Sequence, residues 1–201
     1  YNRDILGWYD TFNRVRTKFY HEHKIWDHLL PASTGIGANN PFDAATMVAA
    51  FAVQPTSPDC QSREVSSPLQ GPAGDYGSSF SRAVLLDSPD HQRLTVSGTA
   101  SIDREGLTVY QDDFTKQVAK THEVVEALLK AQNFGWSDVV RGIAYFRSEE
   151  DFRRSQTWLK ELPFPIIGTV NVVCRDDLLY ELEINAVKEK PTKMADESIK
   201  N

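Results

Sequence analysis

Alternation of apolar and polar positions is clearest between residues 169 and 187, TVNVVCRDDLLYELEINAV. Successive side chains of a strand point to opposite faces of a sheet. The residues that would share an apolar face are Leu178, Tyr180, Leu182 and Ile184. Glu181 and Glu183 would share the other face, with their carboxyl groups about 7 Å apart at a rise of about 3.3 Å per residue. We interpret the stretch as two strands joined at residues 175–177, with a polar face that is either a candidate site or the solvated side of an antiparallel strand.

A second strand with a polar face is predicted over residues 94–102. Alternate positions place apolar residues on one side and hydroxyl-bearing residues on the other, namely Thr95, Ser97, Thr99 and Ser101. Threonine is a good strand former, so one interpretation is a strand that faces solvent. The other interpretation is a polar pocket, because a row of hydroxyls opposite the two carboxylates would orient an oxygen-rich ligand.

Helical periodicity predicts three helices, separated by proline, glycine and polar residues. The predicted helices span residues 4–23, 113–132 and about 149–162, and the further predicted strands are a hairpin within 44–53 and a strand over 139–146. Asp112 or Asp113 caps the second helix, and Ser148 begins a capping box for the third. Residues 54–79 are rich in proline, glycine and serine and are predicted to form a loop.

The order of these elements predicts an α+β fold. Helices in such an order can cover one face of the sheet, which leaves the other face free for a ligand or for assembly. Residues 4–53 also repeat in outline the order of residues 149–187, which is helix, proline, strand, turn, strand. We therefore predict a partial unit and a complete one, with the boundaries 1–55 for the partial unit, 56–79 for a linker, 80–188 for the complete domain and 189–201 for a disordered tail.

Composition excludes several classes of function. The 201 residues carry a formal net charge of −6, without a dense basic run, so we expect no nucleic-acid partner. No apolar run approaches the about 20 residues of a membrane span, so we expect no membrane partner. Cys60 and Cys174 are too few for a disulfide framework and are predicted to be free thiols. Together with the lack of a signal-peptide pattern, this favours a cytoplasmic protein.

Neither a metal nor a cofactor is predicted. His21 and His23 lie two residues apart in a predicted helix, so their side chains would point away from each other. Gly35 and Gly37 lack the spacing, the lysine and the following helix of a phosphate-binding loop.

Several short segments resemble the Rid/YjgF superfamily. They are residues 97–101 (SGTAS), Gln117 and Thr121, residues 136–140 (WSDVV) and residues 181–183 (ELE). The resemblance covers about residues 80–188 and implies a sheet covered by two helices on one face, assembling as trimers. Further segments resemble the chorismatase branch, whose members join two Rid-like units in one chain. These are residues 30–37 (LPASTGIG), 76–77 (YG), 79–83 (SFSRA) and 173–179 (VCRDDLL).

The resemblance to chorismatases implies an activity and a set of site residues. Such enzymes cleave chorismate to pyruvate and a cyclohexadiene or hydroxybenzoate. Glu181 would be the general acid that protonates the enolpyruvyl methylene, and a second carboxyl nearby in a partly dry pocket would raise its pKa. Cys174 would shape the pocket and favour the hydroxybenzoate product, or it is a small buried apolar residue. The predicted contacts to a small acidic substrate are Tyr76, Arg82, Ser97, Gly98, Thr99, Arg147 and Glu183.

Two alternatives stay open at this point. A Rid-type deaminase or hydrolase of altered specificity would grip its substrate with an arginine after a proline–alanine pair, and the comparable positions here hold Ile166, Ile167 and Ser33. A non-catalytic Rid-like module would bind a small metabolite or a protein through its uncovered sheet face. In each case that face favours self-association, as a homotrimer or a pseudo-trimeric assembly. Arg147 is either a surface arginine or a carboxylate anchor at a strand end.

Overall fold

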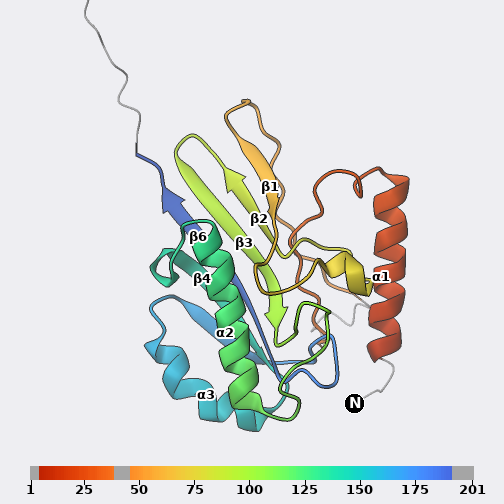
Figure 1. The fold of residues 1–201 in the computed structure, drawn as a ribbon, viewed down its shortest axis with the longest axis vertical. Helices are drawn as coiled ribbons and strands as arrows, with labels where there is room; N and C mark the ends of the chain where they lie inside the picture. Colours follow the sequence, from red (N-terminus) through yellow and green to blue (C-terminus); the bar gives the residue numbers. More distant parts are fainter. Residues whose placement is uncertain (1–4, 39–45, 192–201) are drawn as a thin grey trace, which may run out of the picture.

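Six strands form one sheet in the computed structural model, which describes residues 5–38 and 46–191 (Figure 1). The strands are β1 (Gln61–Val65), β2 (Ala83–Asp87), β3 (His91–Ala100), β4 (Val139–Phe146), β5 (Ile166–Val170) and β6 (Tyr180–Glu189). Their order across the sheet is β1-β2-β3-β6-β4-β5. Neighbouring strands are antiparallel except for the parallel pair β4 and β5. The strand that carries the predicted acid, β6, is therefore a central strand.

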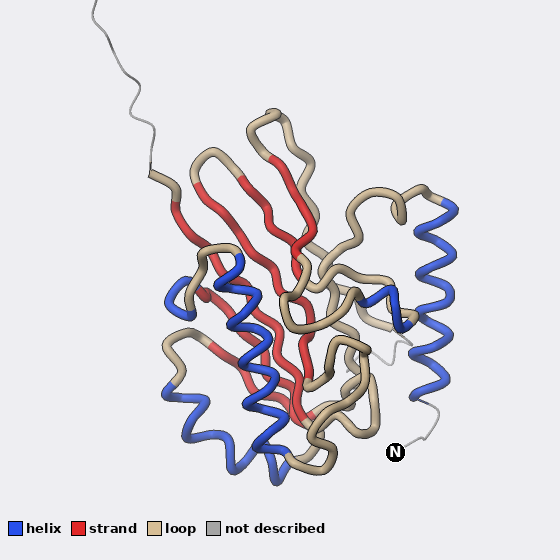
Figure 2. Tube along the Cα trace, viewed as in Figure 1, coloured by secondary structure: helices blue, strands red, loops and turns tan. Residues whose placement is uncertain are grey.

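Two helices cover one face of this sheet (Figure 2). They are α2 (Phe114–Ala131), which packs on β3 and β6, and α3 (Glu149–Glu161), which packs on β4 and β5. A third helix, α1 (Ile5–Glu22), stands apart from them, beside the other half of the sheet (Figure 1). Within the described ranges, none of the helices has the length and apolar composition needed to cross a membrane. The predicted α+β class, with two helices on one sheet face, is confirmed.

The helix starts follow from side-chain caps that the sequence predicts. The carboxylate of Asp113 accepts a hydrogen bond from the backbone N–H of Lys116 at 3.0 Å, which begins α2. The hydroxyl of Ser148 accepts one from the backbone N–H of Asp151 at 3.1 Å, which begins α3. Each cap satisfies one N–H that would otherwise lack an acceptor in the first turn of the helix.

The main core lies between the sheet and helices α2 and α3. Tyr180, Leu182 and Ile184 of β6 are all buried in it, as the alternating pattern predicts. Leu178 is also buried, but it packs in a second, smaller cluster on the opposite side with Ala100. The reason is that β6 begins at Tyr180, so Leu178 belongs to the preceding turn and does not follow the alternation of the strand. Because Tyr180, Leu182 and Ile184 face α2 and α3, the carboxylates of Glu181 and Glu183 between them face away from these helices.

Three predictions about local structure are wrong. The hairpin expected within 44–53 is absent from residues 46–53, which form no strand. Their apolar side chains are exposed, with Val48 at 79%. Residues 44 and 45 lie outside the described ranges. The expected loop over 54–79 contains β1 and the short helix η1 (Ala73–Tyr76). Finally, the first of the two strands expected within 169–187 does not reach the turn at 175–177, because β5 ends at Val170; in the sheet β4 lies between β5 and β6.

The boundary of the predicted tail also moves. Glu189 is the last residue of β6, and the backbone N–H of Lys190 donates to the carbonyl of Asp90 at 2.8 Å. The rest of that prediction, from residue 192 onward, lies outside the described residues. The division into a partial and a complete unit stays a prediction.

Candidate active site

A cavity of about 440 Å³ lies on the sheet face that α2 and α3 leave uncovered. Its walls come from α1, from η1 and the residues after it, from the end of β3, and from residues 174–181. Segments that are far apart in the sequence therefore meet at one end of the sheet (Figure 1). Such a concave site with a few polar groups among apolar walls is typical of small-molecule binding.

A β-bulge in β3 turns part of the strand toward this cavity. The register with β6 shifts between Val96 and Thr99. Before the bulge, Leu94 and Val96 belong to the core under the helices; after it, Ala100 packs in the second cluster on the other face. Gly98, inside the bulge, lines the cavity. Bulges re-aim side chains in this way near functional sites.

The bulge also breaks the predicted row of hydroxyls. Ser97 donates from Oγ to the carbonyl of Ser81 at 2.6 Å, and Thr99 donates from Oγ1 to the carbonyl of Ser97 at 2.8 Å. Ser101 donates from Oγ to the carbonyl of Val109 at 2.9 Å. The hydroxyls of Ser97 and Ser101 fix neighbouring loops to the strand, the hydroxyl of Thr99 bonds within the strand, and none of the three residues lines the cavity. The structure therefore does not place Ser97 and Thr99 where they could contact a ligand in it.

Glu181 is the carboxyl group at the floor of the cavity. Its side chain is 4% exposed, and no described residue donates a hydrogen bond to it. Burial, with a smaller contribution from the negative charge of Glu183, raises the pKa of this carboxyl group to about 8. A carboxyl group with such a pKa carries a proton near neutral pH, so Glu181 can act as a general acid.

Gly98 provides the space that the Glu181 carboxyl group occupies. A Cβ atom at residue 98 would lie 1.9 Å from Oε1 of Glu181 and 2.8 Å from Cγ2 of Thr34. The hydroxyl of Thr34 accepts a hydrogen bond from the backbone N–H of Gly98 at 2.9 Å, which holds the bulge in place. The glycine is required here for close approach.

The second carboxylate of β6, Glu183, lies outside the cavity. Its Oε1 forms an ion pair with Nη2 of Arg141 at 2.9 Å, and it shares a hydrogen bond with Tyr145. The predicted side-by-side placement on β6 is confirmed, but Glu183 influences the cavity through its charge and not by contact.

Four arginines line the cavity or its mouth, of which Arg14 is exposed and the other three are at least partly buried. Arg82, 4% exposed, donates from Nε and Nη2 to the carbonyl of Gly71, both at 3.0 Å. Arg175 donates from Nη1 to the carbonyl of Gly106 at 2.5 Å. Arg16 of α1 is the third. None of the three forms an ion pair with a carboxylate of the described residues.

This excess of positive charge favours an anionic ligand. A buried cation without a counter-charge is costly, and burial does lower the pKa of the Arg82 guanidinium. Tyr76 lies between two of the cations, because its ring centre is 5.2 Å from the guanidinium carbon of Arg82 and 5.3 Å from that of Arg175. Burial raises the pKa of Tyr76 to about 12, so its hydroxyl stays protonated as a hydrogen-bond donor. The cavity thus contains arginine cations and a phenol hydroxyl that could bind the carboxylate of an acidic ligand.

Arg147, predicted to contact the substrate, is occupied elsewhere. Its Nη2 donates to Asp176 Oδ1 at 2.7 Å, and its Nη1 donates to the carbonyl of Arg175 at 3.2 Å. It does not line the cavity. Arg147 does anchor a carboxylate, which is one of the two interpretations of the sequence. That carboxylate is not a substrate group but Asp176, in the turn before β6.

The α1 wall of the cavity has no counterpart in the predicted site. Tyr9, Asn13 and Arg16 line the cavity, whereas Val15 and Phe19, which the periodicity marks as the apolar face, are 60% and 47% exposed. The polar side of α1 is therefore the side that packs. A polar helix face usually faces solvent, so nothing in the pattern alone identifies it as a wall.

Cys174 lines the cavity beside Glu181. Burial, with a smaller contribution from the carboxylate form of Glu181, raises the pKa of the thiol to about 12. The thiolate is the nucleophilic form of cysteine. Cys174 is therefore a neutral wall of the pocket, which agrees with a role in shaping it.

This assignment predicts a slow reaction of Cys174 with iodoacetamide. In a chain with Cys60→Ser, alkylation of the folded protein near pH 8 is expected to be at least about 10²-fold slower than alkylation of the same chain in denaturant, because each unit of pKa reduces the thiolate about tenfold. Mass spectrometry of timed samples gives both rates. Equal rates would show an accessible thiolate and a nucleophilic cysteine.

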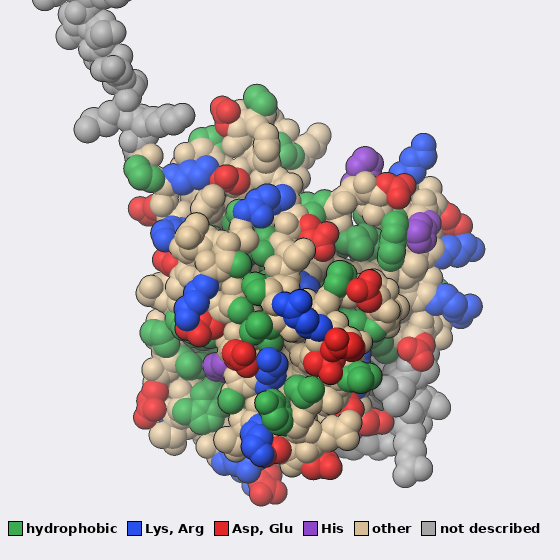
Figure 3. Space-filling view, in the orientation of Figure 1, with side chains coloured by type: hydrophobic (Ala, Val, Ile, Leu, Met, Phe, Trp, Pro, Cys, Tyr) green, Lys and Arg blue, Asp and Glu red, His purple; other side chains and the backbone are tan. Residues whose placement is uncertain are grey.

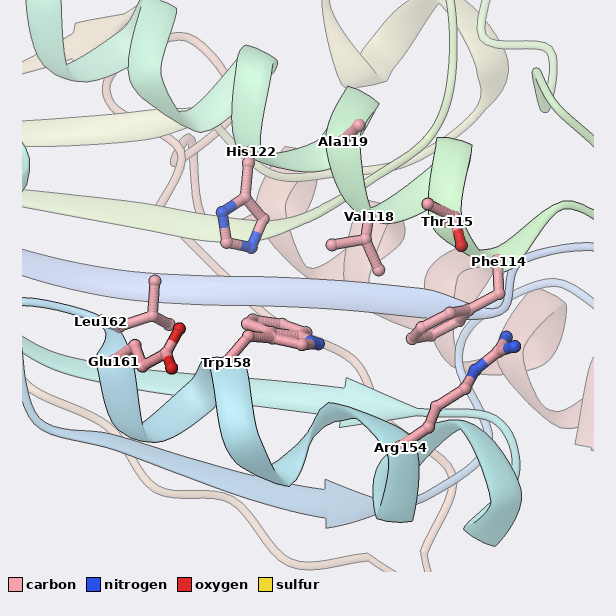
Figure 4. Close-up of a pocket in the computed structure, with 9 residues that line it drawn as sticks. All are labelled: Phe114, Thr115, Val118, Ala119, His122, Arg154, Trp158, Glu161 and Leu162. Atoms are coloured by element: carbon pink, nitrogen blue, oxygen red, sulfur yellow. The ribbon is translucent and has the colours of Figure 1, made fainter.

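A second cavity, of about 660 Å³, lies between α2 and α3 on the covered face of the sheet. Figure 4 shows Val118 and His122 of α2 facing Trp158 of α3 across it, with Arg154 near one end. Nε2 of His122 lies 3.1 Å from the hydroxyl of Tyr180, and burial lowers the pKa of the imidazole to about 4. His122 is therefore uncharged near neutral pH and belongs to the aromatic packing.

Groups that could hold a metal ion are also absent from the described ranges, where no three His, Cys, Asp or Glu side chains cluster. On the face shown in Figure 3, acidic and basic side chains are interspersed. Neither observation adds a further site to the cavity that contains Glu181.

Comparison with protein families gives one match. The family model described as endoribonuclease L-PSP matches residues 77–187, which is more than half of the chain. This range contains β2 to β5 and most of β6, together with α2 and α3. No curated protein matches the chain.

Solved structures share the fold. A chorismatase is 23% identical with a TM-score of 0.55, covering 63% of this chain and 44% of its own. A putative endoribonuclease L-PSP from Entamoeba histolytica is 17% identical with a TM-score of 0.53, covering 64% of this chain and 100% of its own. A putative endoribonuclease from Thermotoga maritima is 25% identical with a TM-score of 0.51, covering 64% and 98%. The chain thus matches less than half the length of the chorismatase.

Proposed function

The chain belongs to the endoribonuclease L-PSP family, within the Rid/YjgF superfamily, and from this premise we propose that it is a chorismatase-like enzyme. It cleaves the enolpyruvyl ether of chorismate or a related cyclic acid, with Glu181 as the general acid. The observation that carries the proposal is the buried, protonated carboxyl group of Glu181 in a cavity whose other charged groups are mainly arginines.

The chemistry begins with proton transfer from Glu181. The proton goes to the methylene carbon of the enolpyruvyl group, which becomes a methyl group, and positive charge develops on the ether carbon. Water attacks that carbon, and the resulting hemiketal collapses to pyruvate and the ring alcohol. The proton lost by the water returns to Glu181, so the carboxyl group ends as it began.

The arginines supply the binding side of the proposal. Arg82 and Arg175 have donors near the cavity and no carboxylate partner among the described residues. A substrate carboxylate would therefore supply the counter-charge that these guanidinium groups lack. Ala100, Ile102 and Leu178 provide an apolar wall against which a ring can pack. The chorismatase that shares the fold supports a cyclic acid as the substrate. The deaminase alternative lacks its arginine, because isoleucine occupies the comparable positions 166 and 167.

The pH dependence of turnover follows from the pKa of Glu181. With a pKa of about 8, the acid form predominates below pH 8, so kcat/KM for chorismate is expected to be level there and to fall about tenfold per pH unit above it. Chromatography of chorismate, pyruvate and the ring product across the pH range measures this. A rate that instead rises through pH 8 would assign the active form to the carboxylate.

Glu183→Gln is the matched control for this profile. The charge of Glu183 raises the pKa of Glu181, so its removal is expected to shift the alkaline decline to lower pH while turnover at the acid end is retained. An unchanged profile would show that another group controls the decline.

Self-association through the uncovered sheet face is part of the proposal. Ile143 and Ile167 are opposite each other in the β4–β5 pair, and Ile167 is 67% exposed. Exposed apolar residues on a sheet favour an interface with another copy, and we propose a trimer. Sedimentation of the purified chain as a single species of monomer mass would contradict it.

A further inference from the structure

Arg16 of α1 has a buried donor that the fold does not use. Its Nη1 donates to Oγ of Ser33 at 3.2 Å, and its Nη2 donates to Oδ1 of Asn13. Its Nε is buried and has no hydrogen-bond partner. A buried donor without an acceptor costs free energy, and such groups in native proteins call for an explanation. No described protein group satisfies this donor, and Arg16 is one of the residues that line the cavity.

The position of Arg16 connects it to the strand that holds the acid. Arg16 and Glu181 line the same cavity. Ser33, which accepts from Arg16, donates from its backbone N–H to Oγ of Ser97 at 2.9 Å. Ser97 in turn precedes Gly98, against which the Glu181 carboxyl group lies. The guanidinium is thus held in one orientation by neutral partners next to the reacting end of the cavity.

The charge around Arg16 leaves its cation without a counter-charge. Asp10 also lines the cavity, but it is exposed and forms no ion pair with Arg16. The guanidinium carbon lies 4.9 Å from the ring centre of Phe12, an apolar neighbour that keeps water away from one side. A carboxylate in the cavity would supply both the missing acceptor and the missing charge.

We propose that Arg16 binds one carboxylate of a dianionic substrate, while Arg82 and Arg175 bind the other, so that α1 makes the cavity selective for diacids over monoacids. The inference rests on the proposed function for the choice of substrate. It adds a substrate-binding residue from outside residues 77–187, the part of the chain that matches the family.

The test is ligand binding without turnover. In a chain with Glu181→Gln, calorimetry compares chorismate and isophthalate, which are diacids, with benzoate, a monoacid. Arg16→Gln is expected to lower the affinity for the diacids about 10-fold or more, because hydrogen bonds to charged groups contribute about 1.5–3 kcal/mol. The affinity ratio of isophthalate to benzoate is expected to fall with it.

Two matched variants separate the role of the guanidinium from bulk charge and from folding. Lys18→Gln removes one positive charge from a side chain on the same helix that is 74% exposed, and it is expected to leave the ratio unchanged. Arg16→Lys keeps the charge but not the guanidinium donors, and it is expected to lose most of the diacid preference. Thermal unfolding of each variant shows whether the fold is retained.

Several results would overturn the proposal. They are an unchanged ratio in Arg16→Gln, an equal loss in Lys18→Gln, full affinity in Arg16→Lys, or no diacid binding by the parent chain. The proposed function fails in a different way: if diacids bind through Arg16 but the chain with Glu181 intact releases no pyruvate, the binding assignment stands and the cleavage reaction is wrong.

Discussion

Replacement of Glu181 by glutamine is expected to lower the rate of pyruvate release from chorismate by about 10²–10⁴-fold, the usual contribution of a positioned general acid. Glutamine has nearly the size of the protonated carboxyl group, but its amide has no acidic proton to transfer to the substrate near neutral pH. The cavity and its arginines are unaffected, so chorismate is expected to bind with nearly the affinity of the parent chain. Steady-state kinetics and calorimetry measure the two quantities separately.

Stability against pH gives an independent check on the same variant. The carboxyl group of Glu181 ionises at about 8 in the folded chain, against 4.5 for an ordinary glutamate. Because the folded-state pKa is raised, the stability that this group contributes is fully present below pH 4.5 and is lost as the pH rises through about 8. Glu181→Gln removes that dependence, so the variant is expected to be more stable than the parent chain above pH 8 in denaturant unfolding.

A different result would separate the alternatives. If Glu181→Gln turns over chorismate at the parental rate, Glu181 is not the acid. If both chains bind chorismate equally and neither releases pyruvate, the protein is a binding module. Glu183→Gln is the control at acid pH, where Glu181 stays protonated in this variant as well, because it removes a carboxylate on the same face of β6 that does not line the cavity.

Gly98→Ala is expected to reduce turnover by about 10²-fold or more, because a misplaced reacting group can cost that much. The new Cβ atom would lie 1.9 Å from Oε1 of Glu181, closer than any real contact, so the carboxyl group must leave its place. The side chain of Thr34 would also be 2.8 Å away, which limits movement of the strand. Overpacking of this kind is expected to lower the free energy of unfolding by about 1–3 kcal/mol.

Gly135→Ala provides the matched control for this substitution. Its new Cβ atom would lie 3.7 Å from Oγ of Ser137, an ordinary contact, and Gly135 has the extended conformation that alanine adopts readily. Turnover and unfolding are expected to change little. Parental kinetics in a folded Gly98→Ala chain would show that the position of the Glu181 carboxyl group next to residue 98 is not needed for the reaction.

The helices and the central strands could be predicted because their signals are local. Asp113 and Ser148 cap α2 and α3, and the bounds of β4, Val139–Phe146, agree with the predicted strand. By contrast β1, an edge strand with the sequence QSREV, has four exposed residues out of five and pairs through its backbone with β2. Backbone pairing without an apolar face gives no periodicity to detect.

The site was predictable in part for a related reason. The alternation in β6 placed Glu181 on the right face, and Tyr76, Arg82, Gly98 and Cys174 do meet it at the cavity. The alternation in β3 misplaced Ser97 and Thr99, because a bulge reverses the faces and no residue pattern marks it. Arg147 and Glu183 found partners nearer by, at Asp176 and Arg141. The role of Arg16 depends on which side of α1 packs, and that is decided by tertiary contacts.

The central claim is that this chain cleaves the enolpyruvyl ether of a cyclic acid with Glu181 as the acid. The most direct measurement is pyruvate release from chorismate by the purified chain, coupled to oxidation of reduced nicotinamide by added lactate dehydrogenase. Steady pyruvate formation that depends on Glu181 is the expected result. A folded, assembled protein that binds diacids and releases no pyruvate would contradict it.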